Sequence, residues 1–194
     1  MIIFTCKIYL MNFCPKKLEL YIFTMLLACV FFVPSSVKAA TYYWVGSAGG
    51  STNSASNWAT SDPSSCTGGG AGVPGSSDTA IFDADCDNSA SIDSALSVQS
   101  LTINTGYSGT ITQETGITIA VARDFTQNDG TFVGGDSTID INYDLRINGG
   151  SFTATSGTIT IALDLDIDAS ATFVHGSGTI HIDGVSASTL SLWK

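Results

Sequence analysis

Two groups of aspartates have a spacing that fits metal chemistry. In the first, Asp83, Asp85 and Asp87 begin like an EF-hand calcium loop, with acids at positions 1, 3 and 5. The later positions depart from that loop, because Asn88 replaces the glycine of position 6 and Ser94 replaces the glutamate of position 12. Calcium is the cation that such oxygen ligands would bind. The alternative interpretation is a set of solvated carboxylates.

The second group is Asp164, Asp166 and Asp168. These residues alternate along one predicted strand, so their side chains are expected on its outer face. Asp124 and Asp144 occupy positions equivalent to Asp164 in the preceding repeats. Stacked like charges are unfavourable unless they are screened, paired or bridged by a cation. This group therefore predicts either a second calcium site or a solvated acidic face.

No residues stand at a spacing typical of catalysis. A polysaccharide lyase would need a basic residue beside bound calcium, and Arg123 and Arg146 are the candidates. Asp166 is expected at the position of Arg146 one coil further on. The positive charge of Arg146 would therefore neutralise part of the acidic face. Neither His175 nor His181 has a nucleophile at a recognisable spacing, and no pair of carboxylates is singled out for hydrolysis. We expect no catalytic residues and no enzymatic activity.

The cysteines predict one disulfide. Cys6, Cys14 and Cys29 lie in the N-terminal leader, and Cys66 and Cys86 remain in the rest of the chain. Two remaining cysteines in an exported protein are expected to pair. Closing that loop would stabilise the fold by about 3 kcal/mol in the chain-entropy view. A zinc site is not expected, since both histidines are distant in sequence.

The elements that position these side chains repeat about every 20 residues in the C-terminal half. Leu165 follows Leu145 by 20 residues, and Phe132, Phe152 and Phe173 are spaced by 20 and 21. Within each unit apolar and polar residues alternate, which is the pattern of a half-buried strand. Glycine and asparagine between the strands supply the corners. Units this short must stack on one another to bury their apolar faces.

This pattern predicts an all-β fold, a parallel β-helix or β-solenoid of about four coils of about 20 residues with an irregular N-terminal cap. The alternative fold is an antiparallel sandwich, which does not require the repeat. Gln127 falls in the stack of Ile103, Ile147 and Ile167, so it either points into a corner or marks a local register shift. The expected inward stacks are Leu101/Phe125/Leu145/Leu165 and Ile119/Ile141/Ile161/Ile182.

Four regions follow from composition: residues 1–39 as a signal peptide, 40–96 as a Gly/Ser-rich cap region, 97–184 as solenoid repeats, and 185–194 as a short tail, with truncation of the reading frame there as an alternative. Lys16 and Lys17 precede a short apolar run and small residues that end at Ala39, as in an export signal. An uncleaved membrane anchor and a lipid anchor at Cys29 are alternatives. Translation would start at Met1 or at Met11.

The negative charge of the chain disfavours anionic partners. The chain carries a net charge of −10, and cleavage after Ala39 would leave only Arg123, Arg146 and Lys194 as basic residues. Such a chain repels nucleic acid and anionic lipid. Contact with a membrane is therefore expected only through the signal segment.

Aromatic residues in the region 40–96 predict a cover for the open end of the solenoid. Bare strand edges invite pairing with other chains, so a solenoid needs such a cover. Trp44, Trp58 and Phe82 are the expected cap residues. The functional alternative for these rings is an exposed platform for sugars.

The leader YYWVG…GG…NW…GVPGSSDTAIFD, followed by coils such as GSFTATSGTITI, resembles secreted bacterial surface proteins with autotransporter-like or filamentous-adhesin-like β-helical repeats. The resemblance covers most of residues 41–183. It implies a right-handed β-helix and roles in adhesion, surface display or polysaccharide cleavage.

These observations predict a secreted, extracellular or outer-surface module with a structural or adhesive role and no catalytic activity. The alternative is a carbohydrate-binding or polysaccharide-cleaving β-helix fragment. Expected partners are an extracellular glycan, a host or neighbouring cell surface, or further β-helix coils stacked on this one. Apart from calcium, no cofactor is expected.

Overall fold

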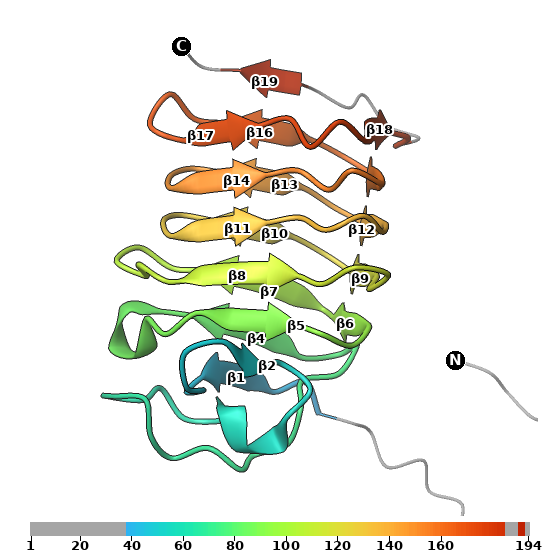
Figure 1. Cartoon of the computed structure of the whole chain (residues 1–194). Helices are drawn as coiled ribbons and strands as arrows, with labels where there is room; N and C mark the ends of the chain where they lie inside the picture. The colour runs from blue at the N-terminus through green and yellow to red at the C-terminus, as the bar shows by residue number, and fades with distance from the viewer. Residues whose placement is uncertain (1–37, 185–189, 193–194) are drawn as a thin grey trace, which may run out of the picture. The chain divides into compact units, whose positions relative to one another are not determined.

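The computed structural model describes residues 38–184 and 190–192. These residues form an all-β parallel β-solenoid, which confirms the fold predicted from the repeat in place of an antiparallel sandwich (Figure 1). Residues 1–37 of the predicted signal peptide, with the alternatives at Met11 and Cys29, lie outside the described residues, as does most of the predicted tail. Within the described residues, no helix is both long enough and apolar enough to cross a membrane.

Each coil contributes one strand to each of three sheets. Sheet A contains β1 (Thr41–Trp44), β3 (Trp58–Ala59), β4 (Thr79–Phe82), β7 (Ser100–Ile103), β10 (Phe125–Gln127), β13 (Leu145–Ile147), β16 (Leu165–Ile167) and β19 (Leu190–Leu192). Sheet B contains β2 (Gly50–Ser51), β5 (Ala90–Ile92), β8 (Thr110–Gln113), β11 (Thr131–Val133), β14 (Ser151–Thr153) and β17 (Thr172–Val174). Sheet C contains β6 (Leu96–Val98), β9 (Ile119–Val121), β12 (Ile139–Ile141), β15 (Thr158–Ile161) and β18 (Thr179–Ile182).

The solenoid has about five turns, one more than the repeat predicts. The additional turn is formed by β4, β5 and β6, whose sequences lack the Phe and Ile pattern of the later coils. Neighbouring strands are parallel throughout, except that β3 pairs with β1 in the antiparallel direction. Figure 1 shows the coils stacked along one axis.

Alternation along each strand explains the core. In β13, Leu145 and Ile147 are buried and Arg146 between them is half-buried, because successive side chains of a strand point to opposite faces. The predicted stack of Leu101, Phe125, Leu145 and Leu165 is confirmed, since each pairs in register with the next. Like side chains therefore lie above one another at roughly the 4.8 Å spacing of strands.

The predicted stack of Ile119, Ile141, Ile161 and Ile182 is confirmed for its last three members and wrong by two residues at its first. Ile119 pairs with Ile139, and Val121 pairs with Ile141. The misleading signal was Ile117, which imitates the Ile-Thr-Ile motif of the later coils but lies in the turn before β9. Counted between register partners, the chain takes seven residues from Thr112 to Ile119 but six from Val133 to Ile139, so this coil has one additional residue at its corner.

Gln127 points into the core, where it pairs in register with Ile103 and Ile147 and is fully buried. Its Nε2 donates to the carbonyl oxygens of Gly130 and Ser151, at 3.2 and 3.1 Å. Its Oε1 has no hydrogen-bond partner among the described residues. The register is therefore continuous through this coil, and a buried amide interrupts an otherwise aliphatic column.

The corner before β11 and β14 depends on glycine. Gly130 and Gly150 both have a positive φ, 68° and 69°, which side chains rarely tolerate. A Cβ on Gly150 would also collide with the carbonyl oxygen of Gly130 in the coil beneath. Glycine therefore allows the coils to approach closely at this edge of sheet B.

Residues 52–78 leave the coil between β2 and β4 and fold against the N-terminal end. Trp44, Trp58 and Phe82 are fully buried there, with ring centroids 5.4 to 5.5 Å apart. Both indole N–H groups donate to backbone carbonyl oxygens, at 2.9 and 2.8 Å. The predicted disulfide between Cys66 and Cys86 is present. It fixes residues 52–78 to the short helix η2 (Ala84–Cys86).

Candidate functional site

Three carboxylates converge beside the disulfide. One ligand oxygen from each of Asp62, Asp83 and Asp85 lies within 4.8 Å of the others. Asp83 precedes η2, and its Oδ1 accepts a hydrogen bond of 3.2 Å from the backbone N–H of Asp85. Asp87, the third predicted ligand, lies outside this group and accepts a hydrogen bond of 2.6 Å from the Ser108 hydroxyl. The structure thus brings together two of the three predicted residues and adds Asp62.

Sequence reasoning missed Asp62 because it lies in the irregular region 40–96. The predicted disulfide, however, could have indicated that Asp62 lies close to Asp83. Asp62 stands four residues before Cys66, and Asp83 stands three residues before Cys86. Joining the two cysteines therefore brings both aspartates to the same place.

Burial and like charge dominate the electrostatics of this carboxylate cluster. Burial raises the pKa of Asp83, and the neighbouring charges of Asp62 and Asp85 raise it further, against hydrogen bonds from the backbone N–H groups of Asp85 and Cys86. The pKa of the Tyr43 hydroxyl is also raised, first by burial and then by Asp62 and Asp83. Both shifts show that negative charge is crowded at this point.

The second predicted group, Asp164, Asp166 and Asp168, follows β16 along the outer face of sheet A. Asp166 pairs in register with Arg146. Arg146 forms ion pairs with Asp124, at 3.2 Å, and with Asp144. The Oδ1 of Asp144 also accepts a hydrogen bond of 2.9 Å from the backbone N–H of Asp164. Arginine and backbone donors thus compensate part of the stacked charge.

Asp168 lies at the exposed end of this series. Its Oδ1 accepts hydrogen bonds from the backbone N–H and the hydroxyl of Ser170, both at 2.9 Å. These two hydrogen bonds lower the pKa of Asp168. Within the described residues, the only group of three or more potential metal ligands is the carboxylate cluster of Asp62, Asp83 and Asp85.

The arginine and histidine residues considered for catalysis contact groups outside the carboxylate cluster. The Arg123 guanidinium lies over the ring of Tyr143, 5.3 Å from its centroid. His175 accepts a hydrogen bond of 3.1 Å from the backbone N–H of Ser177 through Nδ1. His181 is exposed, and its Nδ1 lies 4.0 Å from a carboxylate oxygen of Asp183. None of these contacts pairs a base with a nucleophile.

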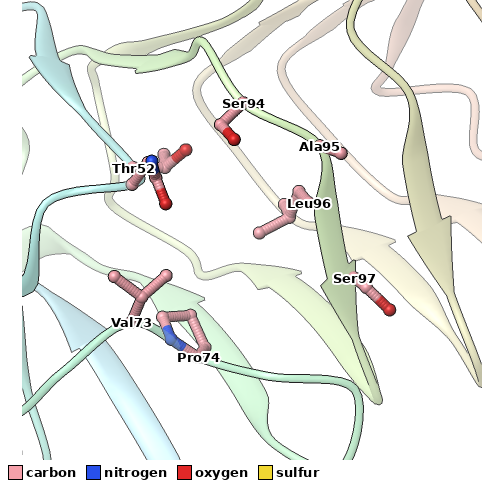
Figure 2. A pocket seen from close by; sticks show the side chains of 8 residues that line it. Thr52, Val73, Pro74, Ser94, Ala95, Leu96 and Ser97 are labelled. Carbon is pink, nitrogen blue, oxygen red and sulfur yellow. The ribbon is translucent and has the colours of Figure 1, made fainter.

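A small notch opens where residues 52–78 meet the corner before β6 (Figure 2). Its cavity of about 20 Å³ has room for one or two water molecules, whereas pockets for organic ligands measure roughly 300 Å³ or more. The lining carries neither aromatic nor charged side chains: it consists of Thr52, Asn53, Val73, Pro74, Ser94, Ala95, Leu96 and Ser97. The predicted aromatic residues Trp44, Trp58 and Phe82 are buried and present no exposed platform for a sugar.

A regular surface of small side chains, half-buried in β8, β11 and β14 and exposed in β17, lies on the outer face of sheet B. Two columns of small side chains run along four coils, in register from β8 to β17. We call this surface the hydroxyl face. The first column is Thr110, Thr131, Ser151 and Thr172, and the second is Thr112, Val133, Thr153 and Val174.

The hydroxyl face is uncharged although the chain is acidic. Carboxylates at its margins are engaged in hydrogen bonds. Glu114, which follows β8, accepts one of 2.6 Å from the Ser91 hydroxyl. Asp129 accepts a hydrogen bond of 3.1 Å from the backbone N–H of Gly106. Asp136 accepts one of 2.7 Å from the backbone N–H of Gly116. By contrast, the six hydroxyl groups of the face make no hydrogen bond to another described group. Their donors and acceptors are available to a partner or to water.

Comparison of the chain with family models, with curated proteins and with solved structures finds no match.

Proposed function

We propose that this chain is a secreted or cell-surface structural and adhesive module without catalytic activity, and that it contacts uncharged extracellular surfaces through the hydroxyl face. The observation that carries this proposal is the two-column array on sheet B, with six hydroxyl groups that have no partner among the described residues. The apolar core beneath sheet B holds the array in place.

Three further observations support a contact surface over a pocket. The notch beside Val73 is too small for a sugar ring. Trp44, Trp58 and Phe82 are buried in the core, although exposed aromatic rings are a frequent means of binding flat ligands. Among the described residues, neither histidine forms a hydrogen bond with a hydroxyl or thiol group that it could activate.

The test is retention of the purified full chain on a panel of insoluble surfaces: cellulose, chitin, mucin-coated beads, whole bacterial cells and ice. Thr131→Lys places a charged side chain in the middle of the hydroxyl face. Thr126→Lys on sheet A and Thr160→Lys on sheet C add the same charge at outward, half-buried positions elsewhere. We expect one surface to retain the wild type and both control variants, and to release Thr131→Lys. Retention on no surface, or equal loss in all three variants, would overturn the proposal.

A further inference from the structure

We infer that the peptide bond between Ala39 and Ala40 is a processing site, and that its cleavage creates an α-ammonium group on Ala40 that forms an ion pair with the buried carboxylate of Asp78. This inference rests on the secretion that the proposed function includes. It concerns the N-terminal end of the solenoid and uses no residue of the hydroxyl face.

The backbone nitrogen of Ala40 already lies against Asp78. It donates to Asp78 Oδ1 at 2.9 Å. The same residue is also held through its carbonyl oxygen, which accepts a hydrogen bond of 2.9 Å from the Thr79 N–H. Thr41, the next residue, pairs in register with Thr79. Cleavage changes the substituents of the Ala40 nitrogen but none of these anchors, so the new ammonium group would form within hydrogen-bond distance of the carboxylate.

The Asp78 side chain is held in a fixed orientation. Asp78 directly precedes β4, and its Oδ2 accepts a hydrogen bond of 2.8 Å from the Gly75 N–H. Its own N–H donates to the Gly75 carbonyl oxygen at 2.9 Å, and its carbonyl oxygen accepts from the Gln99 N–H at 2.7 Å. Because the carboxylate is positioned before cleavage, an ion pair here loses little side-chain entropy.

Within the described part of the chain, Asp78 has no positively charged partner. It is 9% exposed, its side chain accepts from the backbone N–H groups of Ala40 and Gly75, and it takes part in no ion pair there. A buried carboxylate is costly unless a cation compensates its charge. The ammonium group of a processed Ala40 is the cation that this position lacks.

The bond between Ala39 and Ala40 is accessible to a protease. Lys38 and Ala39 are exposed and irregular, and β1 begins only at Thr41. Val37 and Ala39 are small residues of the kind that a signal peptidase selects before its cleavage site. Hydrolysis breaks the C–N bond: water gives its hydroxyl group to the Ala39 carbonyl carbon and a proton to the Ala40 nitrogen. At neutral pH the new carboxyl group then releases a proton and the amine takes one up.

The ion pair would secure the first strand of the solenoid. β1 lies between β3 and β4 in sheet A, and Trp44 at its end packs against Trp58 and Phe82. New chain ends usually fray unless they are tied down. Processing at Ala39 therefore gives this strand a charged anchor at its start.

The experiment uses the full chain, exported by a bacterial host and purified from outside the cytoplasm. Intact mass and N-terminal sequencing should give Ala40 as the first residue. The matched variant has Gly-Ser inserted between Ala39 and Ala40. After cleavage its ammonium group lies on the inserted glycine, while the Ala40 amide N–H still faces Asp78.

Amine-reactive labelling at pH 7, read by mass spectrometry of the N-terminal peptide, compares the two exported proteins. The α-amino group of the wild type should react more slowly by about tenfold or more, because a neighbouring carboxylate favours the protonated, unreactive amine.

Thermal unfolding measures the contribution of the charge pair. Asp78→Asn removes the carboxylate charge and disturbs the Gly75 hydrogen bond in both proteins. The loss that exceeds this shared effect reports the ion pair. We expect Asp78→Asn to lower the unfolding midpoint of the wild type by at least about 3 °C more than that of the insertion variant. If Asp78→Asn does not fold, the labelling rates decide, since both of those proteins keep Asp78.

An exported protein that begins at a residue other than Ala40 would overturn the inference, as would equal labelling rates or equal losses of midpoint. Each of these results leaves retention through Thr131, and with it the proposed function, unaffected. A chain that the host does not export would overturn both the inference and the secretion on which it rests.

Discussion

The rings of Phe132 and Phe152 lie nearly parallel, with centroids 4.9 Å apart and 18° between their planes. The two residues are register partners in β11 and β14, and both are fully buried. Their separation of one repeat along the chain is therefore a separation of one coil along the solenoid. The stack continues to Phe173, whose ring centroid lies 5.9 Å from that of Phe152.

This stack predicts a graded loss of stability. Phe152→Ala should lower the free energy of unfolding by about 3–5 kcal/mol, because it leaves a cavity with ring neighbours on both sides. Phe173→Ala should cost less, since Phe173 is only partly buried in the last complete coil. Urea unfolding followed by circular dichroism measures both values. Equal losses would show that the coils do not stack as described.

The two buried glutamines predict effects of opposite sign. Gln127→Ile should raise the unfolding midpoint, because it removes an unpaired Oε1 and continues the column of Ile103 and Ile147. Gln113→Leu should lower stability by about 1–3 kcal/mol. The Gln113 amide donates to the Ile117 carbonyl oxygen at 2.6 Å and accepts from the Gly135 N–H at 2.9 Å. Thermal unfolding of both variants is the measurement, and destabilisation by Gln127→Ile would contradict this account of the amide.

The raised pKa of Asp83 predicts a pH dependence. The folded protein binds the Asp83 proton more tightly than the unfolded chain, so this group favours folding at low pH. That contribution is lost as pH rises through the folded pKa. Asp83→Asn keeps an acceptor for the Asp85 N–H and removes the charge. It should therefore raise the unfolding midpoint at pH 7 and have little effect once pH has fallen below the folded pKa, where the wild-type carboxyl is protonated.

Asp168→Asn is the matched control, with the opposite sign. Hydrogen bonds from Ser170 lower the pKa of Asp168, so its contribution to stability is present at neutral pH and lost as pH falls through the folded pKa. Asp168→Asn should lower the midpoint at pH 7 and leave it unchanged in acid. The same sign for both variants at pH 7 would contradict these assignments.

The calcium hypothesis predicts a stabilisation that depends on the carboxylate cluster. Calcium bound by Asp62, Asp83 and Asp85 would favour the folded state by about 2.7 kcal/mol at one hundred times its dissociation constant. Millimolar calcium should then raise the midpoint of the wild type above its value in chelator, and Asp83→Asn should remove that increase. Asp166→Asn should retain it. An unchanged wild-type midpoint would contradict calcium binding at the carboxylate cluster.

The fold from β10 to β18 could be predicted because the repeat is complete there. Phe125 and Leu145 recur at one coil position and alternate with polar residues, so period and burial agree. The first full turn was hidden because residues 52–78 interrupt the period and because β5 buries Ala90 where later coils bury Ile or Phe. A buried alanine gives a weak hydrophobic signal even when its strand pairs in register.

The candidate sites depended on long-range geometry to different degrees. Asp83 and Asp85 are local neighbours, and their alternation was visible in sequence. Asp62 joins them through the fold of residues 52–78 and the Cys66–Cys86 bond. The hydroxyl face requires the register between coils, and an error of two residues, as at Ile119, places the wrong side chains in one column. The residues of the candidate sites could therefore be identified from the sequence, but their arrangement in space could not.

The most direct test of the hydroxyl face as a contact surface is a crystal structure at a resolution that shows hydrogens and the first hydration layer. This account predicts one shared χ1 conformation along Thr110, Thr131 and Thr172, with a row of ordered waters that repeats at roughly the 4.8 Å spacing of the coils. Mixed conformations in that column, or waters without this repeat, would contradict it.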